Sequence, residues 1–259
     1  MKEWLLECRE THNHQYHLPK RATETFGSDS FRESQMPTRV LDVGDGSNPR
    51  LQLIDSETME SMEYLALSHC WGEDHFFSAL RSTVDELRKG NVDTALLPAS
   101  FKDAITVARG LKVRYLWIDS LCIIQDDDGD WEHEAARMEQ VYSNAMCVIA
   151  ASSVSGSNQS FLNPRSQRAW VTLPARLGIP RRYVCKFIDD FQLDVEQAVL
   201  NKRGWVLQER ALARRLIHFT STQIYMECGK GVYCESLMKL TKYALVHFLP
   251  PGRTRLTSL

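Results

Sequence analysis

Residues 114–152 constrain the fold more than any other stretch of this 259-residue chain. They begin with an aromatic and β-branched run at 115–118, which predicts a buried strand. An acid-rich connection at 125–130 follows, and residues 131–145 have the apolar spacing of a helix. A second apolar run at 147–151 predicts another strand. Strand, loop, helix and strand in this order form the unit from which parallel sheets are built.

The predicted helix at 131–145 has a charged residue on its apolar side. At about 100° per residue, its apolar face consists of Trp131, Ala135, Met138, Val141, Tyr142 and Ala145. Glu134 projects into this face, in the first turn of the helix. Because burial of an uncompensated carboxylate is costly, Glu134 needs a partner, a water-filled cleft or a function. Two interpretations stay open: Glu134 belongs to a functional site, or it forms a structural ion pair with Arg203 or Arg210.

Composition excludes several classes of protein. A hydrophobic content of 43% and a charged content of 25% are ordinary for a soluble globular protein. The net charge of -2 gives no reason to expect a nucleic-acid-binding surface. No apolar run approaches the roughly 20 residues that span a bilayer, and the first residues lack a signal-peptide core. Seven irregularly spaced cysteines fit reduced thiols better than a disulfide framework, so we expect a cytoplasmic protein.

The first half of the chain predicts an alternation of strands and helices. We expect a short helix near the N-terminus, a hairpin over 38–43 and 50–54, and a central strand over 63–68. Helices are predicted over 80–89 and after residue 98, the second with Ser100 as N-cap. Such alternation indicates an α/β protein with a mostly parallel central sheet flanked by helices.

The second half has a different character. Four short strands are predicted, at 171–173, 183–188, 215–219 and 223–228. Residues 201–213 are polar, and we expect their apolar anchors to be Trp205, Leu207 and Leu212. A last helix is predicted over 236–249, before two prolines. The sequence therefore predicts a β-rich C-terminal extension of the α/β core.

Polar side chains follow two of the predicted parallel strands, where α/β sheets usually bind their ligands. Ser68, His69 and Trp71 lie at the end of the strand at 63–68, and Asp119 and Ser120 follow the strand at 115–118. Glu134 is expected to face the same edge of the sheet. The candidate site has Glu134 as its catalytic residue. Its candidate substrate-binding residues are Ser68, His69, Trp71, Asp119, Ser120, Gln125, Asp126, Trp131, Arg203 and Arg210. Structural roles remain open for several of them: a tight turn at 68–71, a solvated loop with a helix-capping acid at 126–128, and interdomain contacts at 203–210.

The chemistry of such a site is limited by what the sequence lacks. Neither GxGxxG nor GxxxxGK[ST] is present, so no phosphate-binding loop of these types is predicted. A carboxylate in a semi-apolar cleft can stabilise an oxocarbenium-like transition state during glycosidic cleavage. Cys8, His12, His14 and His17 have only approximate metal-ligand spacing and lack a second half-site, which favours a mobile polar segment. We predict no metal and no cofactor.

Three stretches resemble a known family. YLALSHCWGE, LPASFKDAITVARGLKVRYLWIDSLCIIQDDDGDWEHEAARMEQVYSNAMCVIAASS, and RGWVLQERALARRLIHF followed by QIYMEC are similar to the fungal heterokaryon incompatibility (HET) domain over about residues 38–228. The resemblance implies a fungal source and a role in allorecognition and programmed cell death. The resemblance implies a HET domain at 37–235, with its core at 63–152 and its extension at 170–235. The residue pattern adds a polar lead-in at 1–36 and a C-terminal helix and tail at 236–259.

The HET family is in turn similar to TIR domains, which have a flavodoxin-like fold. Some TIR domains cleave NAD with a helical glutamate near a tryptophan, and Trp131 and Glu134 are similar in kind, one residue closer together. This TIR-like resemblance implies NAD as a substrate, cleaved at its nicotinamide–ribose bond. We expect a homo-oligomer on activation, an upstream incompatibility partner protein, no nucleic acid and no membrane span. The alternative is a non-catalytic module that triggers cell death by binding a partner or by oligomerising.

Overall fold

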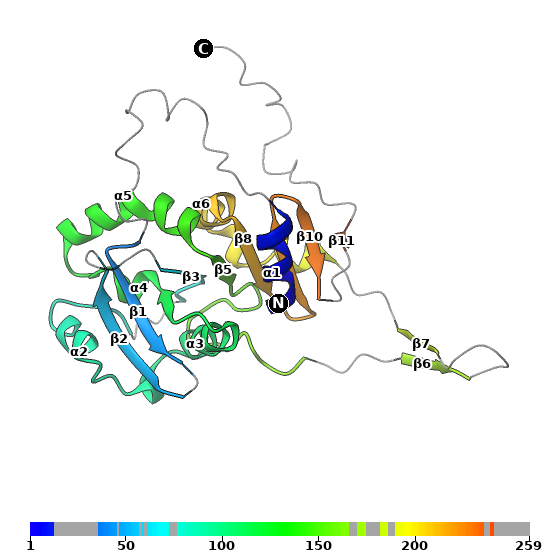
Figure 1. Cartoon of the computed structure of the whole chain (residues 1–259), viewed down its shortest axis with the longest axis horizontal. Coiled ribbons are helices and arrows are strands. Elements are labelled where there is room, and N and C mark those ends of the chain that lie inside the picture. Colours follow the sequence, from blue (N-terminus) through cyan, green and yellow to red (C-terminus); the bar gives the residue numbers. More distant parts are fainter. Residues whose placement is uncertain are drawn as a thin grey trace, which may run out of the picture.

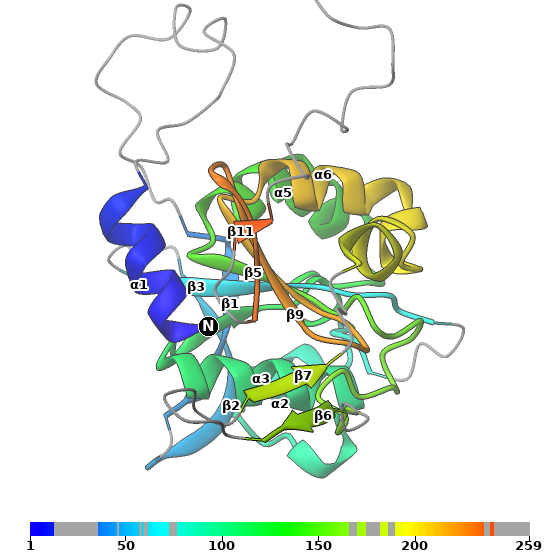
Figure 2. The same cartoon turned by 90° about the vertical axis from the view of Figure 1, so that its right-hand side faces the viewer.

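The protein is built on one large mixed sheet. A computed structural model describes residues 1–12, 36–45, 47–56, 59, 62–72, 77–165, 170–174, 182–185, 190–235 and 239–240. In this part of the chain, nine strands form one sheet in the order β11-β10-β9-β8-β5-β3-β4-β1-β2 (Figure 1). Helices cover both of its faces, which confirms the α/β fold class (Figure 2).

Four parallel strands form the middle of the sheet. They are β3 (Tyr64–Ser68), β4 (Tyr115–Trp117), β5 (Cys147–Ala150) and β8 (Arg215–Phe219). β3 pairs with β4 and β5, and β5 pairs with β8, all in parallel. Nearly every residue of these strands is buried, as continuous apolar runs predict for strands covered on both faces. The strands predicted at these four positions are confirmed.

Antiparallel strands extend both sides of this centre, so the prediction of a mostly parallel sheet is wrong for the sheet as a whole. The predicted hairpin is confirmed as β1 (Arg39–Gly44) and β2 (Pro49–Asp55), with β1 also antiparallel to β4. On the other side, β8 is followed by three antiparallel strands: β9 (Ile224–Cys228), β10 (Gly231–Cys234) and β11 (Lys239–Leu240).

The predicted C-terminal extension therefore continues the main sheet instead of forming a layer of its own. Among the described strands, only β6 (Trp170–Leu173) and β7 (Arg182–Cys185) make a separate, two-stranded antiparallel sheet. Lys239–Leu240 is a strand, which contradicts the helix predicted over 236–249 at these two residues. The rest of that prediction lies outside the described residues. Pairing with β10 explains the difference, because tertiary contacts override a helical pattern in a short segment.

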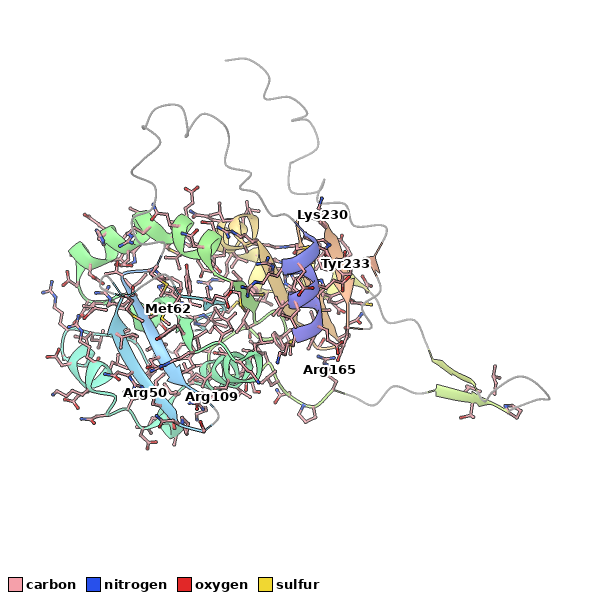
Figure 3. All side chains as sticks on the ribbon, in the orientation of Figure 1. Arg50, Met62, Arg109, Arg165, Lys230 and Tyr233 are labelled. Atoms are coloured by element: carbon pink, nitrogen blue, oxygen red, sulfur yellow. The ribbon has the colours of Figure 1, made fainter. Side chains whose placement is uncertain are left out.

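Two layers of helices enclose the sheet. α2 (Val84–Lys89) and α3 (Ala99–Leu111) lie on one face, and α5 (Asp128–Asn144) and α6 (Gly204–Leu212) lie together on the other (Figure 2). Side chains fill the space between these layers (Figure 3). Shorter elements are α1 (Lys2–Thr11), α4 (Asp119–Cys122), a 3-10 turn at Thr94–Leu96, a π-helical turn at Gln192–Glu196 and a 3-10 turn at Leu200–Lys202. None of the described helices is long and apolar enough to cross a membrane.

The start of α3 differs from its prediction. Pro98, with extended backbone angles, is the N-cap, and Ser100 lies buried in the first turn. Proline fixes φ near the value that a helix needs and has no N–H to satisfy, so it favours a start at this point. The apolar spacing of residues 101, 104, 105, 108 and 111 predicts the buried stripe of this helix: Phe101, Ala104, Ile105 and Ala108 are buried, and Leu111 is half-buried.

The start of α5 lies three residues before the predicted one. The Asp127 side chain caps it by accepting a hydrogen bond from the Asp130 N–H at 3.2 Å, which confirms a helix-capping acid in this loop. Glu134 consequently lies in the second turn, not the first. Trp131 is 47% exposed, so its predicted place on the buried face is wrong. The reason is that no residue from 128 to 133 is buried, so this end of the helix lies outside the core.

Candidate functional site

The strand order places a topological switch point at β3. The chain runs from β3 to its neighbour β4 on one side and then crosses to β5 on the other side. At such a switch point the connections diverge, and ligands of α/β proteins bind at the carboxyl ends of the strands there. Ser68 ends β3 at this point, and its carbonyl accepts a hydrogen bond from the Ala151 N–H at 3.0 Å, just after β5.

Asp119 connects the predicted polar residues at this edge. Its Oδ2 accepts a hydrogen bond from Trp71 Nε1 at 2.8 Å, and its Oδ1 lies 3.8 Å from His69 Nδ1. The Ser120 N–H donates to Asp119 Oδ1 at 2.7 Å, and Gln125 Nε2 donates to the Asp119 carbonyl at 3.2 Å. Five residues predicted from separate segments are therefore neighbours. We call this group, together with Ser68, Tyr142, Arg203 and Glu209, the strand-end cluster.

His69 is a buried, uncharged member of the strand-end cluster. Its ring packs edge-on against Phe101, with ring centroids 5.2 Å apart. Burial lowers the pKa of His69 below its ordinary value, although the nearby Asp119 carboxylate acts in the opposite direction. Arg203 donates a hydrogen bond to the His69 carbonyl, which brings a guanidinium from the second half of the chain to the end of β3.

Glu209 is a functional candidate that is not among the predicted site residues, because the sequence left the charged residues of 203–210 open between a structural role and a role in the pocket. It lies on α6 and is only 5% exposed. Burial raises the pKa of Glu209 to about 7, with a further contribution from Asp119, against hydrogen bonds from Ser68 and Tyr142. Its Oε2 atom has no hydrogen-bond partner within the described part of the chain. A carboxyl group that titrates near neutral pH can act as an acid, a base or a stabilising charge.

The faces of α6 explain why Glu209 was missed. Its buried side chains are Val206, Glu209 and Arg210. Trp205 and Leu207 are 58% and 56% exposed, so two of the three predicted anchors are wrong. Positions three and four residues apart lie on one helix face, so the Val206 spacing was the signal that could have identified Glu209 and Arg210.

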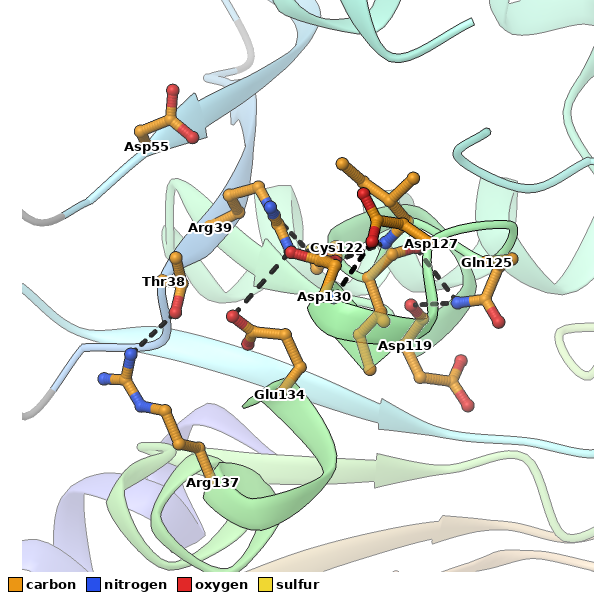
Figure 4. Close-up of polar contacts among 12 residues, drawn as sticks. Thr38, Arg39, Asp55, Asp119, Cys122, Gln125, Asp127, Asp130, Glu134 and Arg137 are labelled. Atoms are coloured by element: carbon orange, nitrogen blue, oxygen red, sulfur yellow. Dashed lines mark hydrogen bonds and ion pairs between the residues drawn. The ribbon is translucent and has the colours of Figure 1, made fainter. Parts of the chain in front are cut away.

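Glu134 belongs to a separate buried network. It is 1% exposed, and Arg39 Nη2 lies 3.7 Å from its Oε1 (Figure 4). Arg39 also binds both carboxylate oxygens of Asp130, at 2.7 and 2.6 Å, and donates to the Cys122 carbonyl at 2.7 Å. Neither Glu134 oxygen makes a hydrogen bond to another described residue. The ion-pair partner is thus Arg39, and not Arg203 or Arg210 as the structural interpretation expected.

Arg210 stabilises a third buried network, away from the strand-end cluster. Its guanidinium binds Glu227 at 2.8 Å and Glu196 at 2.9 Å. Glu227 also contacts His218 Nε2 at 3.0 Å, and His218 Nδ1 lies 3.3 Å from Ser152 Oγ. Burial alone would raise the pKa of Glu227, but hydrogen bonds from His218 and the charge of Arg210 lower it to about 2. These contacts join α6 to β8 and β9.

Two other predicted residues also lie apart from the strand-end cluster. Asp126 is exposed, and its Oδ1 accepts a hydrogen bond from the Arg81 N–H at 2.7 Å. Trp131 is exposed at the start of α5. The structure thus brings together Ser68, His69, Trp71, Asp119, Ser120, Gln125 and Arg203, and it does not bring Glu134, Asp126, Trp131 or Arg210 into the same group of contacts.

Comparison with known proteins gives one match. The family model described as heterokaryon incompatibility protein (HET) matches residues 64–209, more than half of the chain. No curated protein matches the chain, and no solved structure does. The matched range starts at β3 and ends at Glu209, so it contains every member of the strand-end cluster. The chain belongs to the heterokaryon incompatibility (HET) family, and this membership implies a role in heterokaryon incompatibility and cell death.

Proposed function

We propose that the protein acts in heterokaryon incompatibility as an enzyme that hydrolyses the nicotinamide–ribose bond of NAD at the strand-end cluster. One observation carries the proposal: the buried carboxyl group of Glu209, with its pKa raised to about 7, lies among Ser68, Asp119 and Tyr142 at a topological switch point. Enzyme sites are where burial and a neighbouring charge most often perturb a carboxyl group in this way. The resemblance to TIR domains seen in the sequence suggests the same reaction.

The reaction would use Glu209 in its ionised form. The bond between ribose C1′ and the nicotinamide nitrogen breaks, and its electron pair leaves with nicotinamide. The positive charge that develops on the ribosyl group is stabilised by the Glu209 carboxylate. Water adds at C1′ and gives ADP-ribose, with release of one proton. The second carboxylate, Asp119, lies close enough to affect the pKa of Glu209 and is a candidate to orient that water.

The residues around Glu209 suit the rest of such a substrate. Trp71 is half-buried and held by Asp119, so its indole offers an aromatic surface for a planar base. Arg203 is half-buried and adds the positive charge that a pyrophosphate requires. His69 is kept uncharged by burial, so it contributes no further cation.

The test is release of nicotinamide from NAD by the purified chain, measured by chromatography at high protein concentration. We expect Glu209→Gln to reduce the rate by about 100-fold or more, the usual loss when a stabilising group at the reacting centre is removed. Glu134→Gln changes the residue that the sequence predicted as catalytic. Comparison of the two variants shows which buried carboxylate the reaction needs. Glu132→Gln, an exposed position on α5, is the matched control.

Each variant is first compared with the wild type by circular dichroism. Full activity in a folded Glu209→Gln variant would rule out the role of Glu209. Loss of activity in Glu134→Gln alone would transfer the role to the Arg39 network. If the clustered protein releases no nicotinamide from NAD, the proposed NAD hydrolysis is excluded.

A second candidate function is a non-catalytic module that triggers cell death through binding. The observation that favours it is the exposure of Trp131 on α5 and of Trp205 and Leu207 on α6, because exposed aromatic and aliphatic side chains are available to bind a partner. In a fungal toxicity assay, this function predicts that Glu209→Gln remains toxic and that Trp205→Ala does not. The enzymatic function predicts the reverse.

A further inference from the structure

Three metal-ligand side chains meet near the amino end of β8, at the other ends of the strands from the strand-end cluster. Cys8 and His12 come from α1 and its C-cap, and Cys228 ends β9. Their ligand atoms all lie within 4.8 Å of one another. They form the one group of three or more His, Cys, Asp and Glu ligand atoms that lies close enough to hold a metal in the described part of the chain.

Local structure fixes the first two ligands on α1. Side chains four residues apart share one face of a helix, so Cys8 and His12 project in the same direction. The His12 N–H donates to the Cys8 carbonyl at 3.1 Å, which holds His12 directly after the last turn. Trp4 and Cys8 are buried, and the Trp4 ring contacts the ring of Tyr233 on β10, so this face of α1 is anchored against the sheet. Figure 3 shows Tyr233 beside α1.

The third ligand comes from a strand more than two hundred residues away in sequence. Cys228 is paired with Arg215 at the amino end of β8, and its Sγ lies 3.4 Å from His12 Nδ1. The Cys8 and Cys228 thiols share a hydrogen bond. Sequence spacing could not reveal this second half of the site, which is why a metal was not predicted. His14 and His17, considered with them in the sequence, lie outside the described residues.

We propose that Cys8, His12 and Cys228 bind a zinc ion. Two thiolates and one imidazole are ligands that zinc prefers, with bonds of about 2.3 Å to sulfur and 2.0–2.1 Å to nitrogen. A tetrahedral ion with these bonds separates a sulfur and a nitrogen ligand by about 3.6 Å, close to the observed 3.4 Å between Cys228 and His12. The two sulfurs would lie about 3.8 Å apart, within the 4.8 Å limit that encloses all three ligand atoms.

The surroundings also suit a bound ion. Arg215 Nε donates to Cys8 Sγ at 3.3 Å, the type of outer contact that orients a thiolate ligand. Both cysteines are buried and His12 is half-buried, and a water molecule would supply the fourth ligand of a tetrahedral ion. Zinc at this place would join α1 to β9 and stabilise the packing of the N-terminal helix against the sheet.

The experiment uses the tag-free full chain, purified under reducing conditions and stripped of metal with a chelator. Titration with zinc should reach one ion per chain. Titration with Co²⁺ should give the thiolate charge-transfer band and the intense visible bands of a tetrahedral site. Cys8→Ala and Cys228→Ala should lose both signals, and His12→Ala should weaken them. Cys234→Ala, another buried cysteine near the sheet edge, is the matched control and should keep them.

Two results with the wild-type chain, and one with a variant, would overturn the proposal. One is the absence of stoichiometric zinc or of the thiolate–cobalt band in the wild type. The other is a Cys8–Cys228 disulfide, found by mass spectrometry of alkylated peptides from the protein under the same reducing conditions. Because Cys228→Ala removes a buried side chain, His12→Ala serves as the second variant: undiminished cobalt affinity in a folded His12→Ala protein also contradicts the site.

Discussion

At the scale of single residues, protonation of the Glu209 carboxyl group should affect both the stability of the fold and the proposed NAD cleavage. Burial raises its pKa from 4.5 to about 7, so the folded chain binds this proton more tightly than the unfolded chain does. Its contribution to stability is therefore largest below pH 4.5 and is lost as the pH rises through 7, on the order of 3 kcal/mol in total. NAD cleavage should show the opposite trend and increase as Glu209 ionises near pH 7.

The measurement is the unfolding free energy of the wild type minus that of Glu209→Gln, from urea titrations at pH 5 and pH 8. The subtraction is needed because His218 acts in the opposite direction: burial lowers its pKa, so its contribution is present above pH 6.5 and is lost as the pH falls from 6.5 through the lower pKa of the folded state. We expect the difference to move in favour of the variant at pH 8. A difference that stays constant between the two pH values would contradict the buried position of Glu209.

Arg39 supports a second prediction at this scale. It is buried and pairs with both Asp130 and Glu134, so Arg39→Met leaves two carboxylates without their cation. We expect a loss of about 3–5 kcal/mol in unfolding free energy, the usual cost of breaking a buried ion pair from one side. Glu134→Gln in the same background should recover part of the loss, because it removes one of the uncompensated charges.

A double-mutant cycle on Arg39 and Glu134 provides the measurement, and Arg137→Met is its control. Arg137 is also on the inner side of α5, but it donates to the Thr38 hydroxyl at 2.6 Å instead of to a carboxylate (Figure 4). If the two substitutions are additive, the pair at 3.7 Å contributes no coupling, and Glu134 needs another explanation for its burial.

At the scale of elements, the N-terminus of α5 gives a prediction with a built-in control. Asp127 caps the helix through Asp130 N–H and also pairs with Arg81 at 3.1 Å. Asp127→Ala removes both contacts and should cost about 1 kcal/mol of unfolding free energy. Asp127→Asn keeps an N-cap acceptor and loses only a surface ion pair, so its cost should be a small fraction of that. Equal losses in urea titrations of the two variants would show that the charge, not the cap, stabilises this end.

Elements could be predicted where their signal is local, and contacts between them could not. The continuous apolar runs of β3, β5 and β8 and the 3.6-residue spacing of α3 are local signals, and they predict these elements. Periodicity also identified Glu134 as buried on α5. Its partner Arg39 lies at the start of β1, and the sequence pattern contains no information about that pairing.

The same limit explains the candidate site. Residues directly after parallel strands, such as His69 and Asp119, could be expected to meet because the topology brings strand ends to one edge. Glu209 reaches that edge from a helix in the second half of the chain, where Trp205 and Leu207 suggested the wrong buried face. Cys228 likewise joins Cys8 only through the antiparallel pairing of β9 with β8.

At the scale of the whole molecule, the folded unit is larger than the family match. The match ends at residue 209, yet β8 follows it and pairs in parallel with β5 in the middle of the sheet. Leu216, Ile217 and Phe219 of β8 are buried in the core. Burial of each such side chain contributes about 1.5–3 kcal/mol, so loss of β8 would remove a substantial part of the apolar packing of the sheet.

We therefore expect a chain that ends at residue 213 to lose cooperative unfolding, because β5 would become an unpaired edge with its apolar side chains exposed. A chain that ends at residue 240 keeps every described strand and should unfold as the full chain does. Size-exclusion chromatography and urea titrations followed by circular dichroism distinguish the two fragments. A monomeric 1–213 fragment with a sharp transition would mean that the parallel strands β3, β4 and β5 fold without β8, and that the C-terminal strands stabilise the sheet without being required for it.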